Sequence, residues 1–225
     1  MLIAEEFLLL SRTEDTGKLR ASAQHVRLAV CGALLVELAL RERIGVTPHH
    51  LPWRERDRIT VLLERTTEDR ILDTALIEAV KFAGHKPKDV LIRWAGGKVG
   101  KGLADDLMER LVTSGILDHE RRVVLGVVPV DVYPERDPQP ERAVRQRVDA
   151  ALLGAEPSQA TAALIALLVA TDMLTKVISD ETDKKAARRR GKEIAAQAWA
   201  GQAVKDAIAQ INGAISAAAV VATNR

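Results

Sequence analysis

One long segment with almost no polar residue constrains the fold of this chain more than any other feature. Residues 27–43 read RLAVCGALLVELALRER. On a helix, Leu28 and Leu35 fall on one face, while Val30 and Val36 make the other side apolar too. A helix that is apolar all round has to be covered on every side by other elements. The segment therefore predicts a mainly α fold, with this helix in the centre of an apolar helical bundle.

Glu37 is the one carboxylate in the apolar part of this helix. Arg41 lies four residues further on, which is one helical turn along the same face. We therefore expect Glu37 to have a structural role as the partner of Arg41.

The remaining segments predict a ring of mostly amphipathic helices around the centre, in a single domain covering residues 1–225. Apolar spacing and apolar runs predict helices at residues 2–10, 69–82, 88–95, 104–114, 141–153, 159–178, 182–200 and 202–221. The β-branched run Ile59–Leu63 predicts a short strand. Glycine and proline predict breaks in regular structure at Gly45–Pro52 and at Gly96–Gly102, and a polar turn at Thr13–Lys18.

Residues 121–134 read RRVVLGVVPVDVYP and differ in kind from the helical segments. The density of valine, with one glycine and one internal proline, predicts a β-hairpin arm. An exposed apolar arm is prone to aggregation unless something covers it. It can pack on its own bundle, pair with the same arm of a second copy, or dip into a membrane. The candidate self-association residues are Val123, Leu125, Val127, Val128, Val130 and Val132.

Composition excludes several classes of site. The single cysteine, Cys31, excludes a disulfide framework and a cysteine-rich zinc site, and it favours a reducing cytoplasm. The histidines do not show ligand spacing with carboxylates, so no metal site is expected. The apolar run Ala160–Ala170 is shorter than the roughly 20 residues of a membrane span, so any membrane contact is expected at the surface. No cofactor and no catalytic residue are predicted.

The glycine-rich segment Gly96–Gly102 reads GGKVGKG and invites comparison with a nucleotide phosphate loop. That loop requires four residues between its first glycine and the Gly-Lys pair, followed by Ser or Thr. Here Gly96 and Gly100 are separated by three residues, and Gly102 replaces the hydroxyl residue. The expected role is a flexible connection between helices. Backbone amides together with Lys98 and Lys101 near a helix N-terminus nevertheless form a fair anion site.

A second basic feature is the segment Lys184–Lys192, which places six cations in nine residues. On a helix they span most of the circumference, so they predict a solvated face. Attraction to anionic lipid remains an alternative, worth roughly 1 kcal/mol for each cation near the surface. Nucleic acid is not expected as a partner, because aromatic residues do not interleave with the cations. With a net charge of +2, any affinity for anions must come from a local patch.

A series of segments resembles the Golgi phosphoprotein 3-like family. The series begins with EEFLLLSRTEDTGK and CGALLVELALRERI within residues 5–44. It continues with LVTSGIL (residues 111–117), the hairpin, ALIALLVATDML (residues 163–174) and the basic helix. The short loops and the Ala- and Arg-rich composition are typical of a bacterial, more narrowly an actinobacterial, relative.

The resemblance implies a non-catalytic peripheral membrane protein that binds phosphatidylinositol 4-phosphate and the cytoplasmic tails of membrane proteins. It also implies a helical bundle with a hairpin that mediates oligomerisation. The family's lipid pocket uses a tryptophan and three arginines, and these positions fall here at Ser22, Cys31, Lys101 and Ala104. Only Lys101 keeps a positive charge.

The resemblance and the basic residues together predict a cytoplasmic protein, peripheral on the inner face of the membrane. It is expected to bind an anionic phospholipid or a phosphoinositide headgroup through a basic face. The candidate lipid-binding residues are Lys101, Lys98, Arg20 and Arg27. The alternative is a soluble self-associating scaffold or adaptor, a homo-oligomer formed through the hairpin, with no lipid binding.

Overall fold

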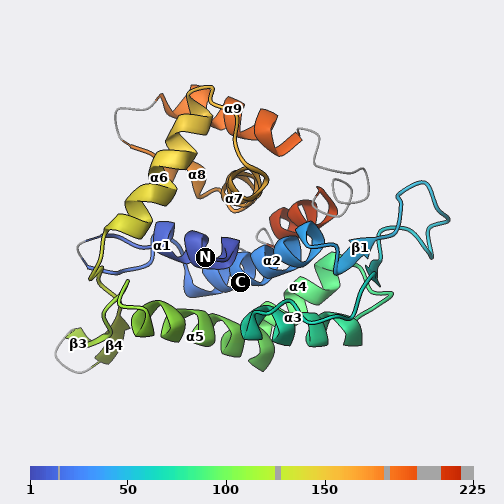
Figure 1. Cartoon of the computed structure of the whole chain (residues 1–225), viewed down its shortest axis with the longest axis horizontal. Coiled ribbons are helices and arrows are strands. Elements are labelled where there is room, and N and C mark those ends of the chain that lie inside the picture. The colour runs from blue at the N-terminus through green and yellow to red at the C-terminus, as the bar shows by residue number, and fades with distance from the viewer. Residues whose placement is uncertain (15, 125–127, 180–182, 197–208, 219–225) are drawn as a thin grey trace.

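The computed structural model describes residues 1–14, 16–124, 128–179, 183–196 and 209–218, and its helices are arranged in three layers (Figure 1). The middle layer contains α1 (Ile3–Leu10) and α2 (Ala23–Leu40). On one side lie α3 (Arg70–Lys81), α4 (Pro87–Gly96) and α5 (Lys98–Thr113). On the other side lie α6 (Gln139–Leu152), α7 (Gln159–Ala170), α8 (Leu174–Val177) and α9 (Lys184–Ala196). Residues 209–218 are also helical. The predicted mainly α class is confirmed.

The two central helices supply much of the core. All eight residues of α1 are buried, and the buried residues of α2 cover every side of that helix, as expected from its sequence. α1 packs against α2, α5, α6 and α7, while α2 also packs against α3, α4 and α7. Within the described residues, α2 is the one helix long and apolar enough to cross a membrane. The sequence had not led us to expect any apolar segment of that length. Because 67% of α2 is buried inside the protein, its apolar surface is already used by its neighbours.

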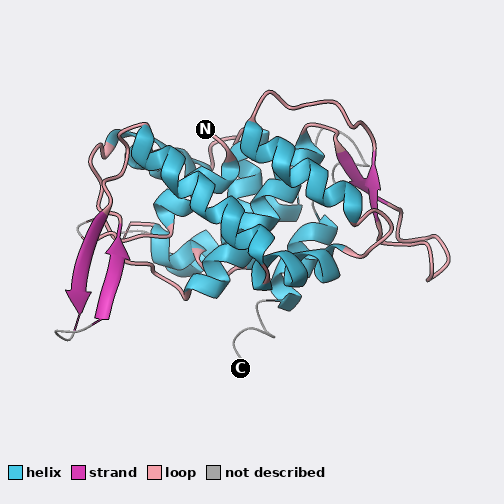
Figure 2. Cartoon of the chain, turned by 90° about the horizontal axis from the view of Figure 1, so that it is seen from below, coloured by secondary structure: helices cyan, strands magenta, loops and turns pink. Residues whose placement is uncertain are grey.

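Two small antiparallel hairpins lie at opposite ends of the bundle (Figure 2). β1 (Ile44–Val46) pairs with β2 (Ile59–Val61), with Gly45 opposite Thr60. β3 (Glu120–Val124) pairs with β4 (Val128–Val132), with Arg122 opposite Val130. The predictions of a strand at Ile59–Leu63 and of a hairpin at residues 121–134 are therefore confirmed. The prediction of an irregular segment from Gly45 onward is wrong at its start, because three buried residues there form β1.

The predicted loop at Gly96–Gly102 is wrong. α4 ends at Gly96, α5 begins at Lys98, and only Gly97 separates the two helices. Gly100 serves close packing instead, since a Cβ on it would lie 2.4 Å from the carbonyl oxygen of Trp94 and 2.8 Å from Sγ of Cys31. Gly100 thus lets the first turn of α5 approach both α4 and α2.

The predicted helix at residues 159–178 is interrupted. α7 ends at Ala170, where the hydroxyl of Thr171 donates to the carbonyl of Leu167 at 2.9 Å. Asp172 has a φ of 54°, a left-handed conformation that stops the helix, and α8 follows as a separate turn. The two helices predicted nearest the C-terminus fall partly on residues 197–208 and 219–225, outside the described residues.

Two glycines in the first turns of α5 provide a matched test of this packing. We expect Gly100→Ala to destabilise the protein by about 1–3 kcal/mol, because the new methyl group has no room. We expect Gly102→Ala to be neutral or to stabilise by up to about 1 kcal/mol, since a Cβ there meets nothing within 4 Å and alanine is the better helix former. Chemical denaturation of both variants checks this. Equal effects at the two positions would contradict the close contact at Gly100.

Candidate functional site

Three of the four cations predicted to bind lipid gather where α2, α4 and α5 meet. Lys98 and Lys101 lie in the first two turns of α5, and both are exposed. Arg27, in the second turn of α2, donates from its guanidinium to the carbonyl oxygen of Ala95 at 3.3 Å. Ala95 lies three residues before Lys98 and close to the end of α4. We call Arg27, Lys98 and Lys101 the corner cluster.

Lys101 has an acidic neighbour. Its Nζ lies 2.6 Å from a carboxylate oxygen of Asp105, one turn further along α5. The side chains are 67% and 61% exposed, so water screens this ion pair and it contributes little to stability. Either side chain can leave the pair at low cost, and Lys101 can reach another anion.

Arg20, the fourth predicted cation, makes a different set of contacts. Its guanidinium donates to the carbonyl oxygen of Arg12 at 2.8 Å and to that of Lys176, in α8, at 3.3 Å. These bonds tie the segment before α2 to the α8 side of the bundle. Arg20 therefore serves as a structural connection.

The four positions that the resemblance assigns to a lipid pocket, Ser22, Cys31, Lys101 and Ala104, are brought together only in part. Cys31 is fully buried, and the contact between its sulfur and Gly100 places it beneath the corner cluster. Burial raises the pKa of the Cys31 thiol to about 12, against a smaller opposing effect of Arg27, so the thiol is neutral. Ser22 instead caps α2, accepting a hydrogen bond from the backbone N–H of His25 at 3.3 Å. Lys101 is the one charged group among the four positions.

The β3–β4 hairpin is fixed at its base and apolar on part of its surface. Tyr133 stacks on His119 with ring centroids 4.8 Å apart, and the guanidinium of Arg12 lies 5.0 Å from the Tyr133 ring. Val132, one of the candidate self-association residues, is buried, whereas Val130 is 39% exposed. Val123 and Val128 lie in the strands, and Leu125 and Val127 fall outside the described residues.

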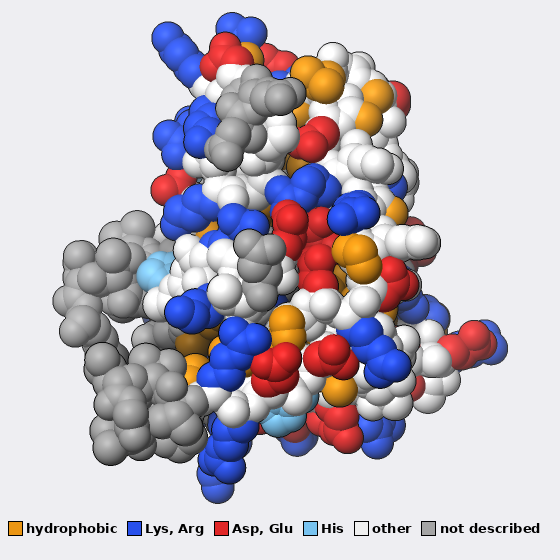
Figure 3. All heavy atoms as spheres, turned by 90° about the vertical axis from the view of Figure 1, so that its left-hand side faces the viewer, with side chains coloured by type: hydrophobic (Ala, Val, Ile, Leu, Met, Phe, Trp, Pro, Cys, Tyr) orange, Lys and Arg blue, Asp and Glu red, His pale blue; other side chains and the backbone are white. Residues whose placement is uncertain are grey.

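The end of the molecule that carries α6 and the hairpin has mixed charge (Figure 3). Arg145 forms ion pairs there with the buried Glu141 and, at 3.1 Å, with Glu14. Burial, together with the nearby Glu141, raises the pKa of Glu135 to about 6. Because acids and cations alternate, this end is not a purely basic surface.

The basic segment at residues 184–192 forms a solvated face of α9. Ala187, Gly191 and Ile194 are the buried residues of this helix. Its cations are exposed except Arg190, which is partly buried and donates to the carbonyl oxygen of Ala151 in α6 at 3.5 Å. Arg188 is paired with Asp172 at 2.6 Å, and Arg190 with Glu193 at 3.5 Å. No group of His, Cys, Asp and Glu side chains within the described ranges could hold a metal ion.

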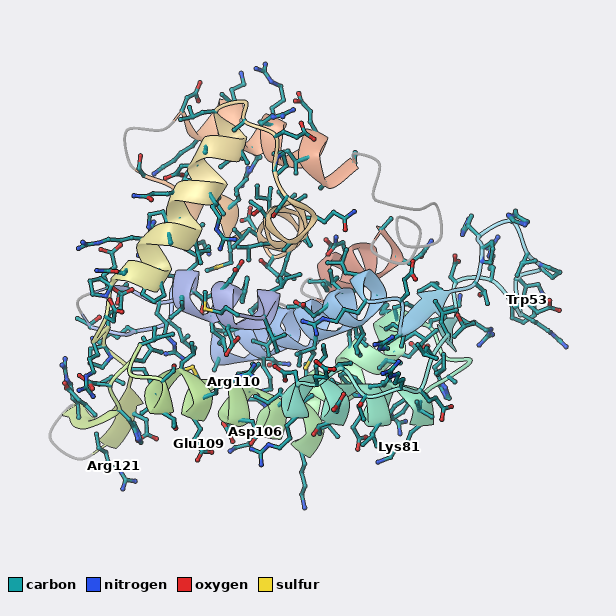
Figure 4. The ribbon with its side chains drawn as sticks, in the orientation of Figure 1. Trp53, Lys81, Asp106, Glu109, Arg110 and Arg121 are labelled. Atoms are coloured by element: carbon teal, nitrogen blue, oxygen red, sulfur yellow. The ribbon has the colours of Figure 1, made fainter. Side chains whose placement is uncertain are left out.

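A charged network centred on Arg110 was not anticipated from the sequence. Arg110 extends from α5 toward the middle layer, whereas Glu109 points away from the bundle (Figure 4). The guanidinium of Arg110 lies 2.7 Å from the buried carboxylate of Glu5 in α1 and 2.6 Å from Asp69, the N-cap of α3. The one available signal was the presence of acids in the apolar segment of residues 2–10, because a buried carboxylate requires a cation.

The pKa shifts of Asp69 and Arg110 agree with the ion pairs of this network. Burial opposes ionisation of Asp69, but the hydrogen bonds from the Leu72 N–H and from Arg110 outweigh it, so the pKa of Asp69 is lowered. Burial likewise opposes the charge of Arg110, yet its bonds to Asp69 and Glu5 raise its pKa. The network borders a cavity of about 490 Å³ that Met1, Arg41 and Ile116 also line. Arg110 pairs with both acids through Nε and Nη1, while its Nη2 is buried without a hydrogen-bond partner among the described residues. Because each charge of the network faces an opposite charge within the protein, we assign it to stability.

Comparison with known proteins gives one result that covers most of the chain. A family model described as Golgi phosphoprotein 3 (GPP34) matches residues 3–211. No curated protein matches the chain significantly. The matched range includes α1–α9, the corner cluster and both hairpins.

Removing Arg110 tests the structural assignment. We expect Arg110→Ala to lower the free energy of unfolding by about 1–3 kcal/mol, because two carboxylates lose their partner. A third of the Arg110 side chain is exposed, and this exposure keeps the loss below that of a fully buried pair. Lys81→Ala, which breaks the more exposed pair with Glu78, is the control and is expected to cost less than about 0.5 kcal/mol. Urea denaturation compares the two, and similar small losses would refute the assignment.

Proposed function

Because the chain belongs to the Golgi phosphoprotein 3 (GPP34) family, we propose that it is a non-catalytic peripheral membrane protein that binds anionic phospholipid through the corner cluster. The family is one of non-enzymatic Golgi phosphoproteins. The observation that carries the proposal is that Arg27, partly buried, is bonded to the end of α4, close to where the exposed Lys98 and Lys101 begin α5.

The geometry of the corner favours a surface contact with phosphate groups. Lys98 and Lys101 project from the first turns of α5, where the positive end of the helix dipole adds to their charge. The bond to Ala95 holds Arg27 against the last turn of α4, which only Gly97 separates from α5. Each cation near an anionic membrane contributes roughly 1 kcal/mol. Three such groups support reversible binding that weakens as salt increases.

The proposed ligand is anionic phospholipid in general rather than one phosphoinositide. A specific headgroup pocket requires several fixed donors, and the neutral residues Ser22, Cys31 and Ala104 occupy the corresponding positions here. Lys101 replaces an arginine there and lacks the planar fork that binds phosphate in a bidentate manner. The cytoplasmic tails of membrane proteins are proposed as further partners, and the cytoplasmic face of the membrane as the site of action.

Vesicle flotation tests the proposal. We expect the protein to float with phosphatidylglycerol vesicles at low salt, to float less at physiological salt, and to stay behind with neutral phosphatidylcholine vesicles. Lys98→Ala combined with Lys101→Ala is expected to lower the affinity on the order of tenfold, because two cations near the surface are lost. Asp105→Asn, which removes an acid from the corner and releases Lys101, is expected to raise it.

A matched control removes the same charge elsewhere. Lys81→Ala combined with Lys88→Ala leaves the corner intact, and we expect vesicle binding close to that of the unaltered protein. Equal losses in the two double variants would mean that net charge alone drives binding, and the corner assignment would be wrong. Vesicles with phosphatidylinositol 4-phosphate at matched total charge test headgroup choice: a strong preference for them would overturn the proposal of a general anionic surface.

The hairpin supports a second candidate function, self-association. It projects from the end of the bundle, and its base is held by the Tyr133 contacts (Figure 1). Val130 is exposed on β4, and it pairs with Arg122 within the hairpin rather than with the bundle. An exposed valine on a two-stranded ribbon suits pairing with a second copy of the same ribbon.

Sedimentation velocity over a range of concentrations tests this second function. We expect a dimer or larger species to grow with concentration, and Val130→Asp to shift the protein toward the monomer by burying a charge in the interface. Leu153→Asp places the same charge on an exposed residue at the end of α6 and serves as the control. If the protein sediments as a monomer at every concentration, the proposal of self-association through the hairpin is wrong.

A further inference from the structure

The connection between β1 and β2 carries an exposed tryptophan away from the bundle. Residues 47–58 project beyond the end of the helical layers, and Trp53 lies at the tip (Figure 4). Its side chain is 66% exposed. By comparison, the helical Trp94 is 1% exposed, and Trp53 is the one aromatic residue among the exposed large hydrophobic side chains of the described ranges.

Internal hydrogen bonds stabilise the conformation of this loop. The Thr47 hydroxyl donates to the carbonyl of Glu55 at 2.5 Å and accepts from the N–H of Arg58 at 2.8 Å. At the tip, the carbonyl oxygen of Pro52 accepts from the N–H groups of Glu55, at 2.8 Å, and Arg56, at 3.0 Å, which closes a turn around Trp53.

The base of the loop is anchored to the bundle. The guanidinium of Arg58 donates to the carbonyl oxygens of Arg54 and Gly84, and Gly84 follows the end of α3. His49 and Asp57 pair across the loop at 2.9 Å. The loop therefore presents Trp53 from a fixed support, and little ordering entropy remains to be lost when the ring meets a partner.

The chemistry of the tip suits the boundary between lipid headgroups and acyl chains. Leu51 and Pro52 precede the ring, and the guanidinium of Arg54 lies 5.0 Å from its centroid. Tryptophan prefers the membrane interface because it combines a large apolar body with one N–H donor. Arginine beside it can bind phosphate while its stem lies along the apolar layer. Three arginines against two acids leave residues 51–58 positive.

We propose that the Trp53 loop inserts into the headgroup region of an anionic membrane, with Trp53 as the apolar anchor and Arg54 and Arg56 contacting lipid phosphates. This inference rests on the proposed function, because it requires that the protein binds membranes. It adds a second contact, at the β1–β2 end of the molecule, whose apolar part resists salt. The corner cluster then supplies long-range attraction, and the loop supplies retention after contact.

Tryptophan fluorescence on vesicles of stated composition tests the insertion. The protein is mixed with phosphatidylglycerol–phosphatidylcholine vesicles in which the phosphatidylcholine is either plain or brominated on its acyl chains. We expect a blue shift of the emission and quenching by the brominated lipid in the unaltered protein, and loss of most of both signals in Trp53→Phe. This variant keeps Trp94 and Trp199, so the difference between the proteins reports Trp53.

Binding measurements on the same vesicles separate the two claims. We expect Trp53→Ala to weaken vesicle binding by about tenfold, through loss of buried apolar area, while the folded far-ultraviolet circular dichroism spectrum is kept. Leu153→Ala, at an equally exposed position on α6, is expected to bind normally. If the unaltered protein binds vesicles but Trp53 variants match it in affinity and quenching, the loop inference is overturned and the proposed function stands. If the unaltered protein binds no anionic vesicle, both are overturned.

Discussion

Burial of α1 is the constraint on which the rest of the structure depends. This short helix is covered on every side, and it contains two carboxylates, Glu5 and Glu6, that cannot remain unpaired in the interior. Arg110 of α5 meets Glu5 at 2.7 Å, and Arg147 of α6 meets Glu6 at 2.8 Å. The two outer layers are thus joined to the same central helix by ion pairs from opposite sides. Hydrophobic burial holds the helix in place, and the carboxylates fix which helices face it.

The second central helix completes this arrangement. Glu37 of α2 pairs with Arg41 at 3.0 Å, as its spacing predicts, and its other oxygen accepts from the N–H of Ile3 at 3.0 Å. A residue identified as structural from one local pair therefore also caps the N-terminus of α1. Sequence spacing showed the contact within the helix. It could not show the contact 34 positions away, because nothing in the spacing reports which helix end lies opposite.

The same limit explains which predictions held. The all-round apolar pattern at residues 27–43 identified the central helix, since such a pattern has one stable location. The glycines at 96–102 misled, because glycine marks both loops and close helix packing, and only the tertiary contact of Gly100 with Trp94 and Cys31 distinguishes them. The contact between Arg27 and Ala95 is also tertiary, so the sequence alone could not predict it. Trp53 was overlooked because a lone tryptophan has no pattern until a fold shows that it is exposed.

Packing at Gly100 also determines which side chains the corner cluster can contain. Position 31 faces the backbone of α5 so closely that only a small side chain fits between α2 and α5. An arginine at this position would force the helices apart, so positive charge has to come from residues on the rim: Arg27, Lys98 and Lys101. In the proposed lipid contact, such rim cations would stay hydrated and be shared among headgroups, which would limit both affinity and selectivity. The proposed membrane contact would gain from a second contact of apolar character, and the exposed Trp53, on a loop at the other end of α4, has the required chemistry.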